Sequence, residues 1–194
     1  MQTRTIYTIG HSSQDVRTFT GLLKRYSIEV VVDVRSSPYS KYASQFNRKN
    51  IQEDIRNNGI KYLFMGREMG GKPADIKFYD TDGYVLYSRI AESLMFIEGI
   101  ERLLKGITQY RIVLMCSEEN PFTCHRRLLI GKVLSDHGVE MLHIRSDGRI
   151  QSEEDVSSEN GMARKDEAQQ RLFVQDNRDE WRSARPVLRH TDAI

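Results

Sequence analysis

The chain has 194 residues, of which 39% are hydrophobic and 29% charged, and its formal net charge is +2. These values indicate a globular domain with an ordinary hydrophobic core, and they exclude a fibrous or wholly disordered chain. No apolar run reaches the roughly 18 residues of a membrane span, and the N-terminus lacks a signal-peptide core, so we expect a cytoplasmic protein with no membrane partner.

The first 150 residues alternate between strand-like and helix-like segments. Apolar, β-branched runs predict strands over residues 6–9, 30–34, 60–64, 111–115 and 141–144. Helices are predicted after a cap at Ser13, and over residues 47–58, 86–105 and 123–137, with a glycine-bearing loop at 66–71. This alternation predicts an α/β fold, with an open, mainly parallel sheet of about five strands flanked by helices in a Rossmann-like three-layer arrangement.

Residues 151–194 have a different character. They hold seven basic and ten acidic residues, which leaves 22 basic and 17 acidic residues in 1–150. No strand pattern is recognised after residue 150, and Ala163 to Arg182 is predicted as one charged helix. We therefore expect an α/β domain over 1–150 and a charged, partly helical extension over 151–194, which packs lightly, mediates homo-oligomerisation or stays partly disordered.

Reactive and polar residues follow four of the predicted strands. In an open parallel sheet, ligands bind beyond the carboxyl ends of the strands, so these loops are expected to meet in one site. The loop residues, in chain order, are His11 and Ser12; Asp33, Arg35, Ser36 and Ser40; Gly70 and Gly71; and the segment Cys116–Arg126.

The two cysteines of that last segment are the strongest candidates for chemistry. A chain with two cysteines and no export signal has no disulfide framework, so they are expected to act as thiols, metal ligands or a redox pair. The sequence places Cys124 in the first turn of a helix, where the macrodipole, His125 and Arg126 would lower the pKa of a thiol. Cys124 is therefore predicted to be the nucleophile or redox thiol, facing Cys116. The alternative is a small residue buried between helix and sheet.

The remaining candidates are polar residues in the other loops. Arg35 with Ser36 and Ser40 is typical of a clamp for phosphate or carboxylate, and Asp33 needs a partner that Arg35 can supply, although such pairs are often only structural. The predicted catalytic residues are Cys124, Cys116, His125, Asp33 and Glu118. The predicted substrate-binding residues are His11, Ser12, Arg35, Ser36, Ser40, Gly70, Gly71 and Arg126.

Several of these stretches resemble one known family. They are Tyr7–Ser12, Val32–Ser40, Gln45–Asn47, Met69–Gly71, Cys116 with Glu118, Cys124–Arg126, Gly138, and His143–Ile144. In this order, over about residues 4–150, they are similar to the domain of unknown function 488 family, in which leucine is usual at the position of Met69. The resemblance implies an intracellular α/β fold and makes these loops signature positions. It names no substrate.

Three functions are compatible with these residues. The first is an enzyme that acts on a small anionic ligand containing phosphate or a nucleotide, without an identified cofactor. The second is a zinc or iron site formed by Cys116, Cys124 and some of His11, His125 and His143. The third is a non-catalytic nucleotide or nucleic-acid binding module, suggested by the net charge of +5 over residues 1–150 and by the basic loop 35–48 with Tyr39, Tyr42 and Phe46.

Overall fold

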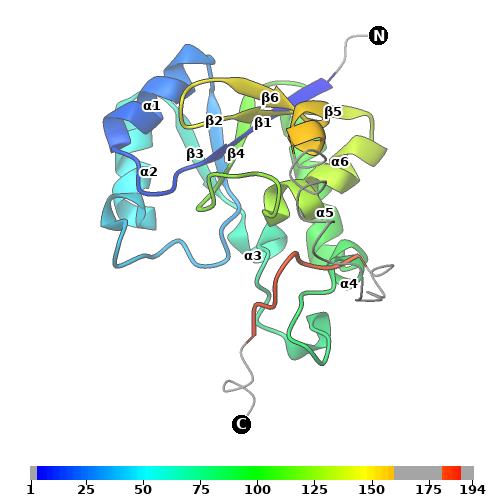
Figure 1. The fold of residues 1–194 in the computed structure, drawn as a ribbon. Helices are drawn as coiled ribbons and strands as arrows, with labels where there is room; N and C mark the ends of the chain where they lie inside the picture. Colours follow the sequence, from blue (N-terminus) through cyan, green and yellow to red (C-terminus); the bar gives the residue numbers. More distant parts are fainter. Residues whose placement is uncertain (1–3, 160–180, 189–194) are drawn as a thin grey trace.

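Six strands form one open sheet in the computed structural model, which describes residues 4–159 and 181–188 (Figure 1). Their order is β3-β2-β4-β1-β5-β6, and all neighbours are parallel except β5 and β6. The strands are β1 (Arg4–Gly10), β2 (Val30–Asp33), β3 (Lys61–Phe64), β4 (Ile112–Cys116), β5 (Val139–Ile144) and β6 (Ile150–Ser152). The predicted open, mainly parallel sheet is confirmed.

Strand β6 is absent from the sequence prediction, which recognises no strand beyond residue 144. It is only three residues long and holds one apolar residue, Ile150, so it has no measurable alternation. Its backbone pairs with β5, and Ile150 lies opposite Ile144. The sheet therefore extends past residue 150, where the extension was expected to begin.

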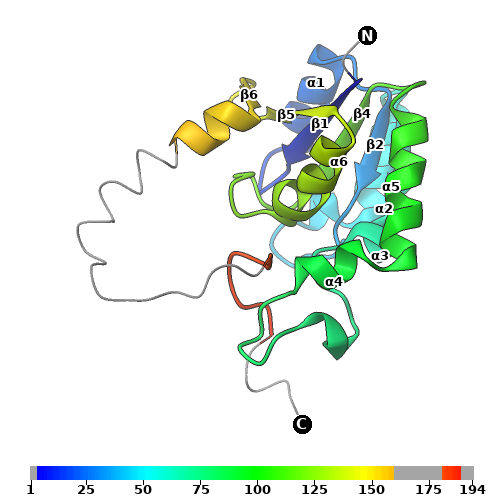
Figure 2. The same cartoon turned by 90° about the vertical axis from the view of Figure 1, so that its right-hand side faces the viewer.

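The sheet is covered on both faces, which gives the predicted three layers. Helices α1 (Val16–Arg25) and α2 (Arg48–Asn57) lie on one side, and α5 (Leu94–Gly106) and α6 (Lys132–Asp136) lie on the other (Figures 1 and 2). Strand residues alternate between the two cores. In β1, for example, Ile6 packs with the α5 side and Ile9 with the α1 side. None of the helices in the described residues is long and apolar enough to cross a membrane.

Three local predictions differ from the structure. Helix α1 is capped by Asp15, whose side chain accepts from the Thr18 backbone N–H at 3.1 Å, and Ser13 is not the cap. The stretch expected to be a loop contains the one-turn helix α3 (Gly66–Met69). Two 3₁₀ turns, Ser44–Phe46 and Ile76–Phe78, were not predicted.

The long helix predicted over 86–105 is two helices, α4 (Tyr87–Ala91) and α5. The break lies at Ser93, which has extended backbone and whose hydroxyl donates to the Ile90 carbonyl at 2.7 Å. Serine competes in this way with the helical hydrogen bonds, which explains its preference for helix ends. The apolar periodicity of the sequence therefore does not predict this break.

The helix predicted over 123–137 begins later than expected. Residues Arg126–Gly131 form a π-helix, which continues into α6 and ends before Gly138, whose φ is +69°. Cys124 therefore precedes the helix, and its backbone N–H donates to the Pro121 carbonyl at 3.1 Å. A π-helix is rare and often occurs at functional sites. The expectation that Cys124 lies in a first helical turn is wrong.

The C-terminal segment, residues 181–188, packs beside α4 below the sheet (Figure 2). Its backbone bonds to the 83–88 stretch: Ser183 donates to the Val85 carbonyl at 2.8 Å, and Ser88 donates to the Trp181 carbonyl at 3.3 Å. The Trp181 indole donates to the Leu128 carbonyl at 2.8 Å. Trp181 and Arg182 are not helical, and the rest of the helix predicted over 163–182 lies outside the described residues.

This docking yields a first prediction. Trp181→Ala removes the Leu128 hydrogen bond and the ring packing, so the amides that bond to the C-terminal segment should exchange with solvent about tenfold faster or more. These are Val85, which donates to the Ser183 hydroxyl, and Ser88. Native-state hydrogen exchange measures both. Tyr42→Ala, at an aromatic residue that is 96% exposed, is the control. Equal exchange in all three proteins would contradict the docking.

Candidate functional site

A cavity of about 360 Å³ lies at the carboxyl edge of the sheet. The pairings of Gly10 with Cys116 and of Asp33 with Met115 and Phe64 bring the strand ends to this edge, as predicted. The cavity is lined by Arg35, Ser36, Ser37, Tyr39, Gly71, Lys72, Tyr87, Cys116, Ser117, Glu118, Thr123, His125, Ser183, Ala184, Arg185 and Val187.

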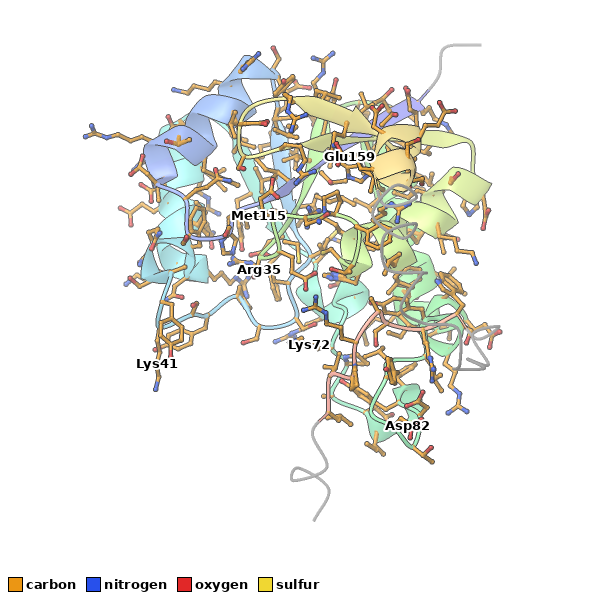
Figure 3. All side chains as sticks on the ribbon, in the orientation of Figure 1. Arg35, Lys41, Lys72, Asp82, Met115 and Glu159 are labelled. Carbon is orange, nitrogen blue, oxygen red and sulfur yellow. The ribbon has the colours of Figure 1, made fainter. Side chains whose placement is uncertain are left out.

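A buried ion pair forms the wall next to β2. Arg35 donates from Nε to Asp33 Oδ1 at 2.9 Å and from Nη2 to Oδ2 at 2.6 Å, and Asp33 is fully buried. Tyr62 of β3 donates to the same carboxylate at 2.6 Å. Arg35 Nη1 also donates to the Phe46 carbonyl at 2.9 Å. Because both carboxylate oxygens accept hydrogen bonds, from Arg35 and Tyr62, Asp33 fixes the position of Arg35, which lines the cavity. Figure 3 labels Arg35 among the side chains.

His11 lies behind this pair and supports it. Its Nε2 is 2.9 Å from Arg35 Nη1, and its Nδ1 is 2.7 Å from the Ser12 carbonyl. A guanidinium can only donate and a carbonyl can only accept, so the ring carries its proton on Nδ1. The ring also stacks on Phe46, with centroids 4.1 Å apart. Burial, and then the Arg35 charge, lower the pKa of His11 to about 4, so the imidazole is neutral.

Two thiols and one imidazole meet at the base of the cavity. The Sγ atoms of Cys116 and Cys124 are each 3.8 Å from His125 Nδ1. The other ring nitrogen, Nε2, is 3.1 Å from the Val34 carbonyl and must donate to it. This bond holds the ring so that Nδ1 faces both sulfurs.

The two thiols differ in exposure and in charge. Cys116 lines the cavity and is 5% exposed, whereas Cys124 is fully buried and does not line it. The Cys124 thiol donates a hydrogen bond to Cys116, which is the main cause that lowers the pKa of Cys116 well below its ordinary value. The charges of His125 and Arg126 add to this effect. Burial, and then the Cys116 neighbour, raise the pKa of Cys124 well above its ordinary value.

The pKa shifts of Cys116 and His125 are consistent with each other. Burial alone would lower the pKa of His125, but the charge and hydrogen bond of Cys116 outweigh it and raise that pKa overall. These shifts favour negative charge on Cys116, positive charge on His125 and a neutral thiol at Cys124.

Arg126 supports this site from behind the cavity. It is 1% exposed, and its guanidinium donates to the carbonyls of Glu118 and Glu119 and, at 3.2 Å, to the Thr8 hydroxyl. Its contacts hold the loop after Cys116 in place, while its charge favours the thiolate. Arg126 therefore acts on the loop and on Cys116, and does not itself line the cavity.

Two glycines are required by close approach. A Cβ at Gly71 would lie 2.5 Å from Cγ of His125, and a Cβ at Gly10 would lie 1.8 Å from the Glu118 carbonyl oxygen. Any larger residue at these positions would displace the imidazole or the loop after β4. Gly70 has a similar constraint but does not line the cavity.

The predicted site residues thus fall into three sets. Those that line the cavity are Cys116, Glu118, His125, Arg35, Ser36 and Gly71. Those buried behind it are Cys124, Asp33, His11 and Arg126. Ser12, Ser40 and Gly70 lie outside the lining.

Their contacts explain why Ser40 and His143 are not part of the cavity. The Ser40 hydroxyl accepts from the backbone of Tyr42 and Ala43 and so shapes its own turn. His143 lies between the Thr8 hydroxyl and Glu153, 2.7 Å from each. His143 and His11 are therefore both held by other partners. Of the three histidines considered as metal ligands, His125 alone lies with the two cysteines.

Sequence reasoning missed several lining residues, chiefly Lys72, Tyr87 and the stretch 183–187. Lys72 follows the predicted glycine loop and could have been found there. The 183–187 stretch has no comparable signal, because its apolar residues are scattered and its contacts are distant in sequence. Of the aromatic residues of the 35–48 loop, Tyr39 lines the cavity, Tyr42 is exposed and Phe46 is buried against His11.

Comparison with protein families gives a match over most of the α/β domain. The family model of the domain of unknown function DUF488 matches residues 15–133. This range includes Asp33, Arg35, Cys116 and Cys124, and it leaves His11 and the C-terminal segment outside. No curated protein and no solved structure matches the chain.

The lowered pKa of His11 predicts a pH effect on stability. The unfolded chain binds a proton at His11 near pH 6.5 and the folded chain only near pH 4, so stability falls as the pH drops between these values. Between pH 7 and pH 4.5 this single group should cost about 2 kcal/mol in the free energy of unfolding. In His11→Gln, the amide oxygen can still accept from Arg35 but no proton is taken up. The decrease in its free energy of unfolding over the same pH interval, measured with urea, should therefore be smaller by about 2 kcal/mol. An equal loss in both proteins would contradict this role.

Proposed function

The chain belongs to the family of the domain of unknown function DUF488, and we propose that it is an enzyme in which the Cys116 thiolate attacks a small anionic substrate. The observation that carries the proposal is the position of Cys116: it is the cysteine that reaches the cavity, and His125, Cys124 and Arg126 favour its thiolate. A thiolate, and not a thiol, is the reactive nucleophile of cysteine enzymes.

The neighbours of Cys116 supply the other parts of such a reaction. In the first step, Cys116 Sγ bonds to the electrophilic atom of the substrate, and the bond to the leaving group breaks. His125, protonated and facing the cavity, gives its Nδ1 proton to the leaving group. Water then cleaves the bond to sulfur, with neutral His125 as the base, and restores the thiolate. Glu118 lies in the same wall and is an alternative proton carrier.

The proposal assigns different tasks to the two cysteines. Sequence reasoning placed the nucleophile at Cys124, but this side chain is fully buried and its pKa is raised. Its task here is to donate a hydrogen bond to Cys116. Arg35 and Ser36 both line the cavity and remain the proposed hydrogen-bond donors to the substrate, although Asp33 already balances the charge of Arg35.

The reactivity of Cys116 can be measured without a substrate. Free cysteine loses more than about tenfold in alkylation rate between pH 8.5 and pH 7, because its thiolate disappears. Cys116 should lose less than this with iodoacetamide, because its pKa is lowered well below its ordinary value. Cys124→Ala removes the donor, so the pKa of Cys116 should rise and its rate at pH 7 should fall, yet alkylation should persist. Fast alkylation that survives in Cys116→Ala would sink the proposal.

A second candidate function is metal binding by Cys116, Cys124 and His125. Their donor atoms all lie within 4.8 Å of one another. In tetrahedral zinc coordination, with bonds of about 2.3 Å to sulfur and 2.0–2.1 Å to nitrogen, the sulfur and nitrogen atoms are roughly 3.6 Å apart. The observed 3.8 Å is close to that separation. The bond from His125 Nε2 to the Val34 carbonyl is also the kind that orients metal-binding histidines.

These residues fit a three-ligand site whose fourth position opens on the cavity. Protein purified without a histidine tag under reducing conditions should then contain about one zinc or iron per chain. His125→Gln should lose it, whereas His137→Gln, at an exposed histidine outside the cavity, should keep it. A substoichiometric metal content in the unaltered protein would exclude this candidate and leave the thiolate enzyme.

A further inference from the structure

The C-terminal segment supplies one wall of the cavity, through Ser183, Ala184, Arg185 and Val187. These residues lie beyond the part of the chain that the family model matches. The wall therefore comes from the extension and is added to a base that the matched region provides.

The segment is held in a defined position at this wall. Ser183 is buried, and its hydroxyl accepts from the Val85 backbone at 3.0 Å and donates to the Arg185 carbonyl at 2.8 Å. Arg182 forms an ion pair with Asp80 at 2.7 Å, and Val187 donates to the Gly83 carbonyl at 2.8 Å. These bonds fix the backbone on both sides of Arg185, which lies in the wall between them.

The charges of the cavity wall are mainly positive. Arg35, Lys72 and Arg185 contribute three cations besides His125, which lies beside Cys116, and Glu118 contributes the single carboxylate among the lining residues. Arg35 is already neutralised by the buried Asp33. Lys72 and Arg185 therefore supply the positive charge that exceeds the single negative charge of Glu118. Lys72 lies between Arg35 and the C-terminal segment, whereas Lys41 lies at the tip of the 36–47 loop, away from it (Figure 3).

We infer that Arg185, together with Lys72, binds the anionic group of the substrate, so that the C-terminal extension completes the substrate site. This inference rests on the proposed function, in which the substrate is a small anion that reacts at Cys116. The guanidinium suits a phosphate or carboxylate because its donors match two oxygens at once. Arg185 is thus a substrate-binding residue that the family match does not include.

The inference can be tested with two alkylating agents of similar size. Iodoacetate is an anion and iodoacetamide is neutral. Both alkylate the Cys116 thiolate with loss of iodide, and they add a carboxymethyl and a carbamoylmethyl group, respectively. Removal of one cation from the cavity wall should slow iodoacetate by about threefold to tenfold at low ionic strength, and the effect should shrink as salt is added. The rate with iodoacetamide should change less than about twofold.

The variants are Arg185→Gln and Lys72→Gln, both at exposed side chains. Lys24→Gln removes an equal charge from the end of α1, which does not line the cavity, and should change neither rate. Equal slowing by Lys24→Gln would show a general charge effect and overturn the inference. An unchanged ratio of the two rates in Arg185→Gln would overturn it as well. In both cases a fast reaction of Cys116 with iodoacetamide would still support the proposed thiolate, so the inference would fail without the proposed function failing.

A second measurement does not depend on thiol reactivity. In Cys116→Ser protein, inorganic phosphate should shift the amide resonances of Gly71 and Ser117, which line the cavity. Adding Arg185→Gln should weaken this binding by about threefold or more. If Cys116 proves unreactive but phosphate still binds through Arg185, the proposed function fails and the anion site stands. If phosphate binds equally with and without Arg185, the inference fails.

Discussion

The buried ion pair between Asp33 and Arg35 is the interaction on which the candidate site depends. Asp33 ends β2, Tyr62 reaches it from β3, and His11 and the Phe46 carbonyl approach Arg35 from two other loops. Buried pairs of this kind contribute little net stability, because desolvation of the two charges offsets their attraction. Their clearer effect is positional. Here four separate parts of the chain are fixed around one ion pair at the cavity wall.

The end of β2 also determines the arrangement of the thiols. Val34 follows Asp33, and its carbonyl holds the His125 ring, so the geometry of β2 reaches the base of the cavity. His125 then faces both sulfurs, and the difference between the sulfurs comes from their surroundings. Cys116 ends a strand and meets the cavity, while Cys124 is enclosed by the π-helix that follows it and by the sheet. One cysteine is placed to react, and the other to donate a hydrogen bond.

The sheet and most residues at its carboxyl edge could be predicted from the sequence, for physical reasons. The apolar strands are short and continuous, so their carboxyl ends could be located, and parallel pairing then brings His11, Asp33, Arg35 and Cys116 to one edge. The order of exposure of the two cysteines could not be predicted. It depends on where the helix after Cys124 begins, and helix boundaries are not determined by apolar periodicity. The contribution of Arg185 depends on long-range backbone bonds to Val85 and Gly83, which have no local signature.

The central claim is that Cys116 is the reactive thiol at the base of the cavity. Treating the native protein at pH 7 with less than one equivalent of iodoacetamide, followed by tandem mass spectrometry, tests it most directly. Fragment ions distinguish the two cysteines, which lie eight positions apart in the chain. The structure predicts that the adduct is found almost entirely on Cys116. An adduct on Cys124, or an equal division between the two, would contradict the account.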